Sequence, residues 1–284
     1  MIRGRQVRRR RWPRLDVLSI LLAPLGIGVV AAAQLLDGSR LSSLIQGPSA
    51  LVVFGGTLGA ILITHTPLEV LRAVRAAVAA FRAPDDDIDT LAATIVTLSI
   101  RAHRRGAAAL EPDLDHVTDP LLQSGLSLVV DGTSPELLKQ VLTLESRAQE
   151  AEEDAPARIF EAAAGYAPTL GILGAVLGLM RVMEHLGSPG MLGSGIALAF
   201  VATVYGVGLA NLVLLPIAGR LRERALMRSR RRELIVEGLE ALQQRINPRL
   251  VAQKVRAFSS SMPRIDELAA HGGLRPARKP GIPA

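Results

Sequence analysis

The sequence predicts an all-α, polytopic membrane protein with four transmembrane helices and a helical cytoplasmic domain. Hydrophobic residues make up 49% of the 284 residues and charged residues only 21%, and the mean hydropathy of +0.31 is high for a soluble chain. Four long stretches contain no charged side chain: 17–36, 41–68, 162–180 and 186–219. About 20 residues of helix cross the hydrocarbon core, so each stretch can span a bilayer.

The first uncharged stretch has an alternative interpretation as a secretory signal peptide. It follows seven arginines in residues 1–14, and the alanines at 31–33 could form a cleavage site. However, its 20 residues exceed the usual apolar centre of a signal peptide. A secreted protein would also not carry three further spans, so a transmembrane helix is favoured.

The distribution of basic residues predicts the topology of these spans. Seven arginines precede the first span, three follow the second, and seven lie within 220–232, whereas the two short links between spans hold only Arg40 and Arg181. Lys and Arg concentrate on the cytoplasmic side, so both termini and the long middle segment are expected there. Orientation and anionic lipid account for the basic clusters, and no nucleic-acid partner is expected.

The resulting domain organisation alternates membrane and cytoplasmic segments. The middle segment carries a net charge of −8 and the segment after the fourth span +9. These opposite charges favour packing of the two segments against each other, although two separately solvated surfaces remain an equal alternative.

The predicted segments are a basic cytoplasmic N-terminus (1–14), transmembrane helices 1 and 2 with a short periplasmic link (15–68), a helical cytoplasmic domain (69–161), transmembrane helices 3 and 4 (162–218), a cytoplasmic helical region (219–258) and a disordered tail (259–284).

Local signals predict where the cytoplasmic helices begin and end. The second span is expected to continue outward as a helix over 68–81, and the fourth over 220–245, where Asn247 and Pro248 break it. A helix over 90–104, capped by the acids at 85–89, should stop at Gly106. The sequence Thr-Ser-Pro-Glu at 133–136 is typical of a helix start, and this helix could run on into the third span.

Small residues at four-residue spacing in the spans predict close helix packing. Such residues let the backbones of membrane helices approach each other. Prolines at 24, 168 and 216 could in addition kink a span or simply be tolerated near its ends. The predicted packing residues are Gly55 and Gly59 in the second span, Gly174 and Gly178 in the third, and Ala202, Gly206 and Ala210 in the fourth.

The chemistry of the spans excludes several functions. No Asp, Glu, Lys or Arg lies within any of the four uncharged stretches, yet an ion pathway needs a titratable or coordinating group at depth. Either the protein transports no ions, or another chain supplies the carboxylate. The sequence has no cysteine and its five histidines are scattered, so no metal site is expected. No acid–base pair of catalytic residues is visible either, so we expect neither a cofactor nor an enzymatic activity.

Six blocks stand out in the spans and the middle segment: PSALVVFGGT (48–57), GLSLVVDGT (125–133), YAPTLGILG (166–174), ATVYG (202–206), AN (210–211) and LPIA (215–218). Together they resemble the MotA/PomA stator subunits of the bacterial flagellar motor, which belong to a wider family with ExbB and TolQ. The resemblance covers most of residues 15–258. The first pair of spans favours the flagellar branch, because ExbB and TolQ have three spans.

The resemblance implies a shared channel. Five copies of the subunit are expected to surround two copies of a MotB-like protein, which has one span, binds peptidoglycan and carries the ion-binding aspartate. Ion passage would then turn this ring, and its cytoplasmic rim would drive the rotor protein FliG. No cofactor is implied.

The resemblance also assigns roles to individual residues. Pro168 and Pro216 match prolines used at the channel and in conformational coupling, and Thr203 matches a threonine that lines the ion path. Sodium-type members have threonine where this chain has Ala175, so protons are favoured. For contact with the rotor, Glu111 matches the acidic residue, and the basic position falls at His103, with Arg104 and Arg105 beside it.

Two other functions fit parts of the sequence. One is an ExbB/TolQ-like energiser of an outer-membrane process. The other is a non-conducting membrane scaffold, which composition alone would fit equally well.

Overall fold

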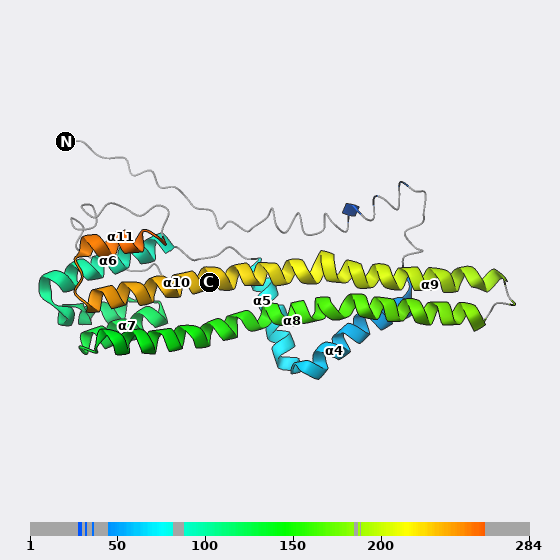
Figure 1. The fold of residues 1–284 in the computed structure, drawn as a ribbon, viewed down its shortest axis with the longest axis horizontal. Coiled ribbons are helices and arrows are strands. Elements are labelled where there is room, and N and C mark those ends of the chain that lie inside the picture. Colours follow the sequence, from blue (N-terminus) through cyan, green and yellow to red (C-terminus); the bar gives the residue numbers. More distant parts are fainter. Residues whose placement is uncertain are drawn as a thin grey trace, which may run out of the picture. The chain divides into compact units, whose positions relative to one another are not determined.

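Every regular element that the described residues form is helical, as predicted (Figure 1). This computed structural model describes residues 28, 29, 32, 36, 45–81, 88–184, 187 and 189–258. Most of the predicted first span, the arginine-rich N-terminus, the acids expected to cap a helix at 85–87 and the predicted disordered tail therefore lie outside the described residues. The chain forms two compact units: unit 1 contains Met1–Pro84 and Asp154–Arg224, and unit 2 contains Asp85–Glu153 and Ala225–Ala284.

Three helical segments among the described residues are long and apolar enough to cross a membrane: Gly47–Thr64, Pro135–Glu184 and Gly195–Gln243. They contain the second, third and fourth predicted spans. The count of four spans stays a prediction, because the first stretch is mostly outside the described residues.

The second span is built from three consecutive helical pieces. They are α3 (Gly47–Ala50), the π-helix η2 (Leu51–Gly55) and α4 (Gly56–Thr64). Pro48 lies in the first turn of α3, where its missing N–H would have had no partner in the helix.

The helix predicted over 68–81 is present, but it does not continue the second span, and that part of the prediction is wrong. His65 has an extended backbone after α4, and a new helix, α5 (Pro67–Ala80), meets α4 at a corner (Figure 1). The N–H of Glu69 donates to Thr66 Oγ1 at 3.3 Å, and the N–H of Thr66 donates to Glu69 Oε2 at 2.9 Å. This reciprocal capping box, with Pro67 in the first turn, starts a helix rather than extending one.

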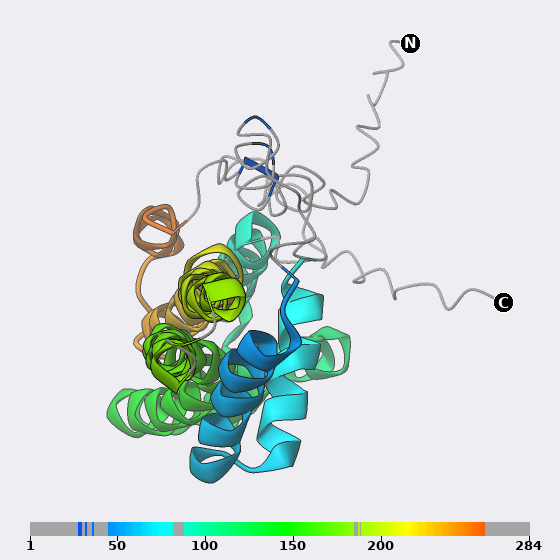
Figure 2. The same cartoon turned by 90° about the vertical axis from the view of Figure 1, so that its right-hand side faces the viewer.

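The third and fourth spans form a helix pair in unit 1. The third lies in the 50-residue helix α8 (Pro135–Glu184), which Pro156 and Pro168 do not interrupt. The fourth contains α9 (Pro189–Gly208), the π-helix η4 (Leu209–Leu214) and the start of α10 (Leu215–Gln243). Figure 2 shows α4, in blue, beside the paired α8 and α9.

The π-helix η4 accommodates Pro216 in the fourth span. The N–H of Leu215 donates to the carbonyl of Ala210, five residues earlier, so one extra residue enters this turn. A proline ring clashes with the carbonyl four residues before it in an α-helix. The wider turn directly before Pro216 therefore offers a physical account of how the helix continues through it.

Unit 2 has its own hydrophobic core. It is formed by α6 (Ile88–Arg105), the 3₁₀ segment η3 (Ala107–His116), α7 (Pro120–Val130), α11 (Pro248–Val255) and the parts of α8 and α10 that belong to unit 2. Gly106, with φ of 85°, separates α6 from η3, as the sequence predicted. The largest fully buried side chains of this core are Ile95, Leu98, Leu110, Leu121, Leu126, Leu138, Leu142, Leu234, Ile235 and Leu239.

Side-chain caps mark the helix starts of unit 2. Ser134 Oγ accepts the N–H of Leu137 at 3.3 Å at the start of α8, as the Thr-Ser-Pro-Glu signal predicted. Asp119 Oδ1 accepts the N–H of Leu121 and of Leu122 before α7, at 3.0 and 3.1 Å. Asn247 caps α11 in the same way.

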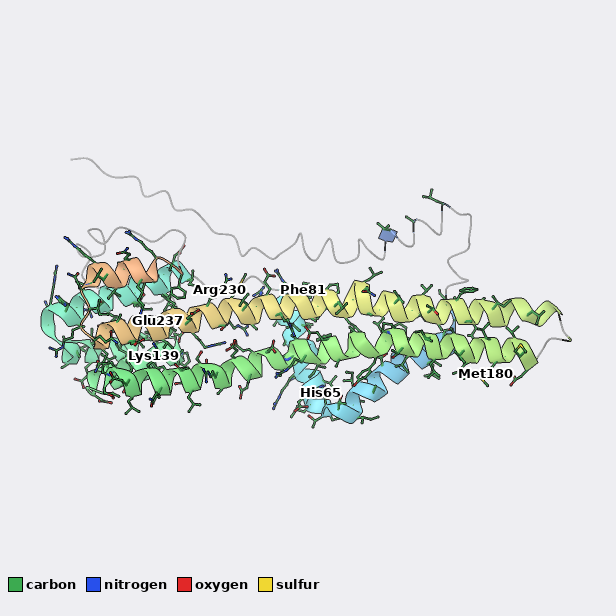
Figure 3. All side chains as sticks on the ribbon, viewed as in Figure 1. His65, Phe81, Lys139, Met180, Arg230 and Glu237 are labelled. Atoms are coloured by element: carbon green, nitrogen blue, oxygen red, sulfur yellow. The ribbon has the colours of Figure 1, made fainter. Side chains whose placement is uncertain are left out.

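The acidic and basic segments pack together in unit 2, as their opposite charges favoured: Arg231 of α10 lies 3.0 Å from Asp119, and Arg232 lies 2.8 Å from Glu153 of α8. Pairs of the reverse polarity add to these contacts. Lys139 of α8 lies 2.8 Å from Glu240 and 3.9 Å from Glu237, both on α10 (Figure 3). The hydrogen bond to Glu240 and the negative charge of that residue raise the pKa of Lys139 above its usual value. Ion pairs and the shared hydrophobic core thus join α8 and α10 in unit 2.

Candidate functional site: the α8–α9 interface and the α6–η3 surface

Two glycines set the distance between α8 and α9. A Cβ on Gly206 would lie 2.5 Å from the carbonyl oxygen of Ala167 and 3.0 Å from the Cα of Gly171. A Cβ on Gly171 would lie 2.9 Å from the carbonyl oxygen of Ala202. Because these neighbours are backbone atoms, no side-chain rotation could relieve the overlap. The two helices approach this closely only with glycine at both positions.

The same interface includes further predicted packing residues. A Cβ on Gly174 would lie 2.8 Å from the Cβ of Ala202, and one on Gly178 would lie 2.8 Å from the backbone nitrogen of Ala199. Ala210 is buried against Ala164 and Ala167. The structure thus places the small residues predicted in the third and fourth spans along one helix pair.

The second span contacts α8 through a different glycine from those predicted. A Cβ on Gly56 would lie 3.0 Å from Leu170 Cδ2, whereas nothing lies within 4 Å of the Cβ position of Gly59. The Cβ position of Gly55 meets only Leu51 of the same segment, at 3.5 Å. Within the described part of this chain, Gly55 and Gly59 therefore make no close helix–helix contact.

The four predicted channel residues lie at separate places in unit 1. Thr203 is half-buried, and its hydroxyl donates to the carbonyl of Ala199 at 3.4 Å; its Cα lies 3.4 Å from the Cβ position of Gly171 on α8. Ala175 is half-buried on α8, one turn beyond Gly171. Pro168 is also half-buried on α8, and Pro216 is exposed on α10.

Two polar contacts that the sequence did not predict attach the second span to α9. The Ser49 hydroxyl donates to the carbonyl of Leu198 at 3.0 Å, and Ser49 itself is buried. The N–H of Gln46 donates to the Tyr205 hydroxyl at 3.2 Å, and the Tyr205 ring lies 5.7 Å from that of Phe54. These partners are about 150 residues apart, so no local pattern could have paired them.

The residues predicted to contact the rotor are exposed on two adjoining elements of unit 2, α6 and η3. His103, Arg104 and Arg105 are exposed in the last turn of α6, and Glu111 is exposed on η3. An ion pair between Arg101 of α6 and the buried Asp113 of η3 joins the two elements beneath them. This α6–η3 surface therefore presents basic and acidic groups on a fixed support.

The part of the chain that the structure describes contains no candidate metal centre. Groups of three or more His, Asp or Glu side chains that could hold an ion are absent there.

Comparisons with known proteins agree with these features. A profile of the MotA/TolQ/ExbB proton channel family matches residues 113–234. Motility protein A of Bacillus subtilis is 30% identical over 252 residues, covering 88% of this chain and 93% of the relative. The uncharacterized protein YtxD of the same organism is 32% identical over 250 residues, covering 87% and 92%.

A solved structure shows the same fold over most of the chain. The flagellar MotAB stator complex of Bacillus subtilis contains a chain with a TM-score of 0.76 and 30% identity, covering 89% of this chain and 98% of that one. Proteins of this family are membrane channel and stator subunits rather than enzymes. The chain therefore belongs to the MotA/TolQ/ExbB proton channel family, as a flagellar motor stator subunit of the MotA/PomA branch and a multi-pass protein of the bacterial inner membrane.

Proposed function

We propose that this subunit forms, together with a MotB-like partner, a proton channel that converts ion-motive force into torque on the flagellar rotor. One observation carries the proposal: the predicted spans contain no carboxylate, although a proton path through a membrane needs a titratable group. The partner, a single-span peptidoglycan-binding protein, would supply this aspartate. The relative of known structure was solved as a MotAB complex, which supports such a partner.

The outer faces of α8 and α9 support assembly into a larger ring. Opposite their shared interface, both helices expose large apolar side chains that one copy leaves uncovered. Five subunits around two partner chains would cover part of this surface with protein and leave the rest to lipid. The exposed side chains are Ile172, Leu173, Val176 and Leu177 on α8, and Ile196, Phe200, Val204 and Val207 on α9.

The topology that we propose places both termini and unit 2 in the cytoplasm. It follows the arginines that flank the spans and keeps the domain boundaries predicted from the sequence. In this orientation the α6–η3 surface would face the rotor protein FliG, with Glu111 and the basic residues His103, Arg104 and Arg105 as its contacts.

In the membrane, we assign Thr203 to the ion pathway and Ala175 to the wall beside it. The Thr203 hydroxyl is bonded only weakly to its own helix, at 3.4 Å, and could relay a proton through water. Pro168 and Pro216 would let the third and fourth spans change shape as the ion passes, because a proline leaves one helical carbonyl without its donor.

Proton flux is expected only when the subunit is produced with its partner. The subunit alone should give background flux in vesicles carrying a pH-sensitive dye, because it has no carboxylate in its spans. Co-production with the partner should raise the flux, and changing the partner's intramembrane aspartate to asparagine should return it to background. Equal flux from the subunit alone would overturn the shared channel.

Rotation is expected to follow the proton-motive force. Ala175 offers no hydroxyl to replace the water around a sodium ion, and Thr203 offers one. The speed of tethered cells should therefore persist when external sodium is replaced by potassium and fall when an uncoupler collapses the proton gradient. If rotation stopped without sodium while the membrane potential was held, the ion would be sodium.

A further inference from the structure

A cavity of about 300 Å³ opens in unit 2 at the start of α7. Three arginines of α10 line it: Arg228, Arg231 and Arg232. Residues three and four apart lie on one face of a helix, so these guanidinium groups converge on the same space. Two carboxylates complete the charged lining, Asp119 before α7 and Glu153 of α8.

The two carboxylates do not neutralise the three arginines. Glu153 lies 2.8 Å from Arg232 Nη1 and 3.6 Å from Arg228 Nη1. Asp119 Oδ2 lies 3.0 Å from Arg231 Nε, while its other oxygen caps α7. The cavity lining therefore keeps one excess positive charge, which an anion could balance.

The buried guanidinium of Arg232 still has hydrogen-bonding capacity. Arg232 is 5% exposed, and its Nη1 donates to Glu153. Its Nε and Nη2 are buried and have no hydrogen-bond partner among the residues that the structure describes. Buried donors of a charged group that lack acceptors destabilise the folded state, so an oxygen acceptor at this place would be favourable.

We propose that this cavity binds a phosphate-type oxyanion, either inorganic phosphate or the phosphate group of a soluble small molecule. Arginine suits this ligand, because its planar donors match phosphate oxygens in pairs. The hydroxyl of Thr118 and the amide of Gln149 also line the cavity and can donate to further oxygens. A bound oxyanion would link α7, α8 and α10, independently of ion conduction.

The position of the arginines along α10 favours a soluble ligand over a lipid headgroup. The fourth uncharged stretch ends at Gly219, and Arg228 comes nine residues later. Nine residues span about 14 Å of α-helix. The headgroup layer on each side of a bilayer is only about 5–8 Å thick. The cavity is therefore expected to lie beyond the reach of lipid phosphates.

Equilibrium dialysis with radiolabelled inorganic phosphate tests the proposal on the full-length protein in detergent. Saturable binding of one phosphate per chain is expected, with a melting temperature that rises with phosphate concentration. Arg228→Gln removes a half-exposed arginine of the rim and should weaken binding about tenfold, the value of one charge-assisted hydrogen bond. Arg230→Gln is the matched control, because Arg230 is exposed on the same helix (Figure 3) and does not line the cavity.

The remaining outcomes are decisive in either direction. Unchanged phosphate affinity in Arg230→Gln, with the loss in Arg228→Gln, supports the site. No saturable binding at millimolar phosphate, or equal losses in both variants, overturns it. Binding of the wild type to vesicles containing phosphatidic acid, with none of free phosphate, would also overturn it. Circular dichroism of both variants checks that neither has lost its helices.

Discussion

Replacing Gly206 by valine is expected to destabilise the membrane part of the subunit by at least about 3 kcal/mol and to abolish swimming. Overpacking a core usually costs about 1–3 kcal/mol, but here the new Cβ would meet backbone atoms of Ala167 and Gly171 that cannot rotate away. The helices α8 and α9 would have to separate. Thermal unfolding in detergent and swimming of a strain complemented with the variant measure the two effects.

Gly208→Val provides the control for this substitution. Gly208 lies two residues further along α9, and no described residue comes within 4 Å of its Cβ position. Both variants carry the same cost in helix propensity, so the difference between them isolates the close contact. If both unfolded at the same temperature, the close approach of α8 and α9 would not contribute to stability.

Leu239→Ala is expected to have the second large effect, within unit 2. Leu239 is fully buried in the core of this unit, where it packs against Gly125 and leaves no room for a Cβ on that glycine. Removing a buried leucine side chain costs about 2–5 kcal/mol through lost burial and the resulting cavity. Hydrogen exchange of α7 and α10 should accelerate by a corresponding factor, and motility should fall with the amount of folded protein.

Leu250→Ala is the matched variant in the same unit. Leu250 is 57% exposed on α11, so its truncation should change exchange rates little. Equal acceleration in both variants would show that the Leu239 position does not support the core as described.

The sequence predicted the start of α8 and the end of α6 in unit 2, because short local signals determine them. Ser134 and Gly106 were found from local patterns alone. The capping box at Thr66 and Glu69 has the same form as the one expected at 133–136. It lies at the end of an uncharged stretch that runs to Leu68, and hydropathy alone predicts a continuous helix there. Hydropathy reports where a membrane helix could extend, whereas hydrogen bonds of the cap decide where it ends.

The candidate site in the membrane was only partly predictable. Four-residue spacing identified Gly174, Gly178 and Gly206, which lie in the α8–α9 interface. In the second span the same rule selected Gly55 and Gly59, while the contact is made by Gly56. The contacting face depends on how a helix is rotated towards its neighbours, and a run of apolar residues on all sides carries no information about that rotation.

The π-helix η4 constrains the number of residues between the small side chains of the fourth span. Ala202, Gly206, Ala210 and Ala218 lie at multiples of four residues, and all are buried. In a regular α-helix, with 3.6 residues per turn, such a series would wind about 160° around the axis over these sixteen positions. One extra residue in a π-turn removes about 100° of that drift. The small residues stay in phase because the turn is wide, so the number of residues between them is constrained as strictly as their size.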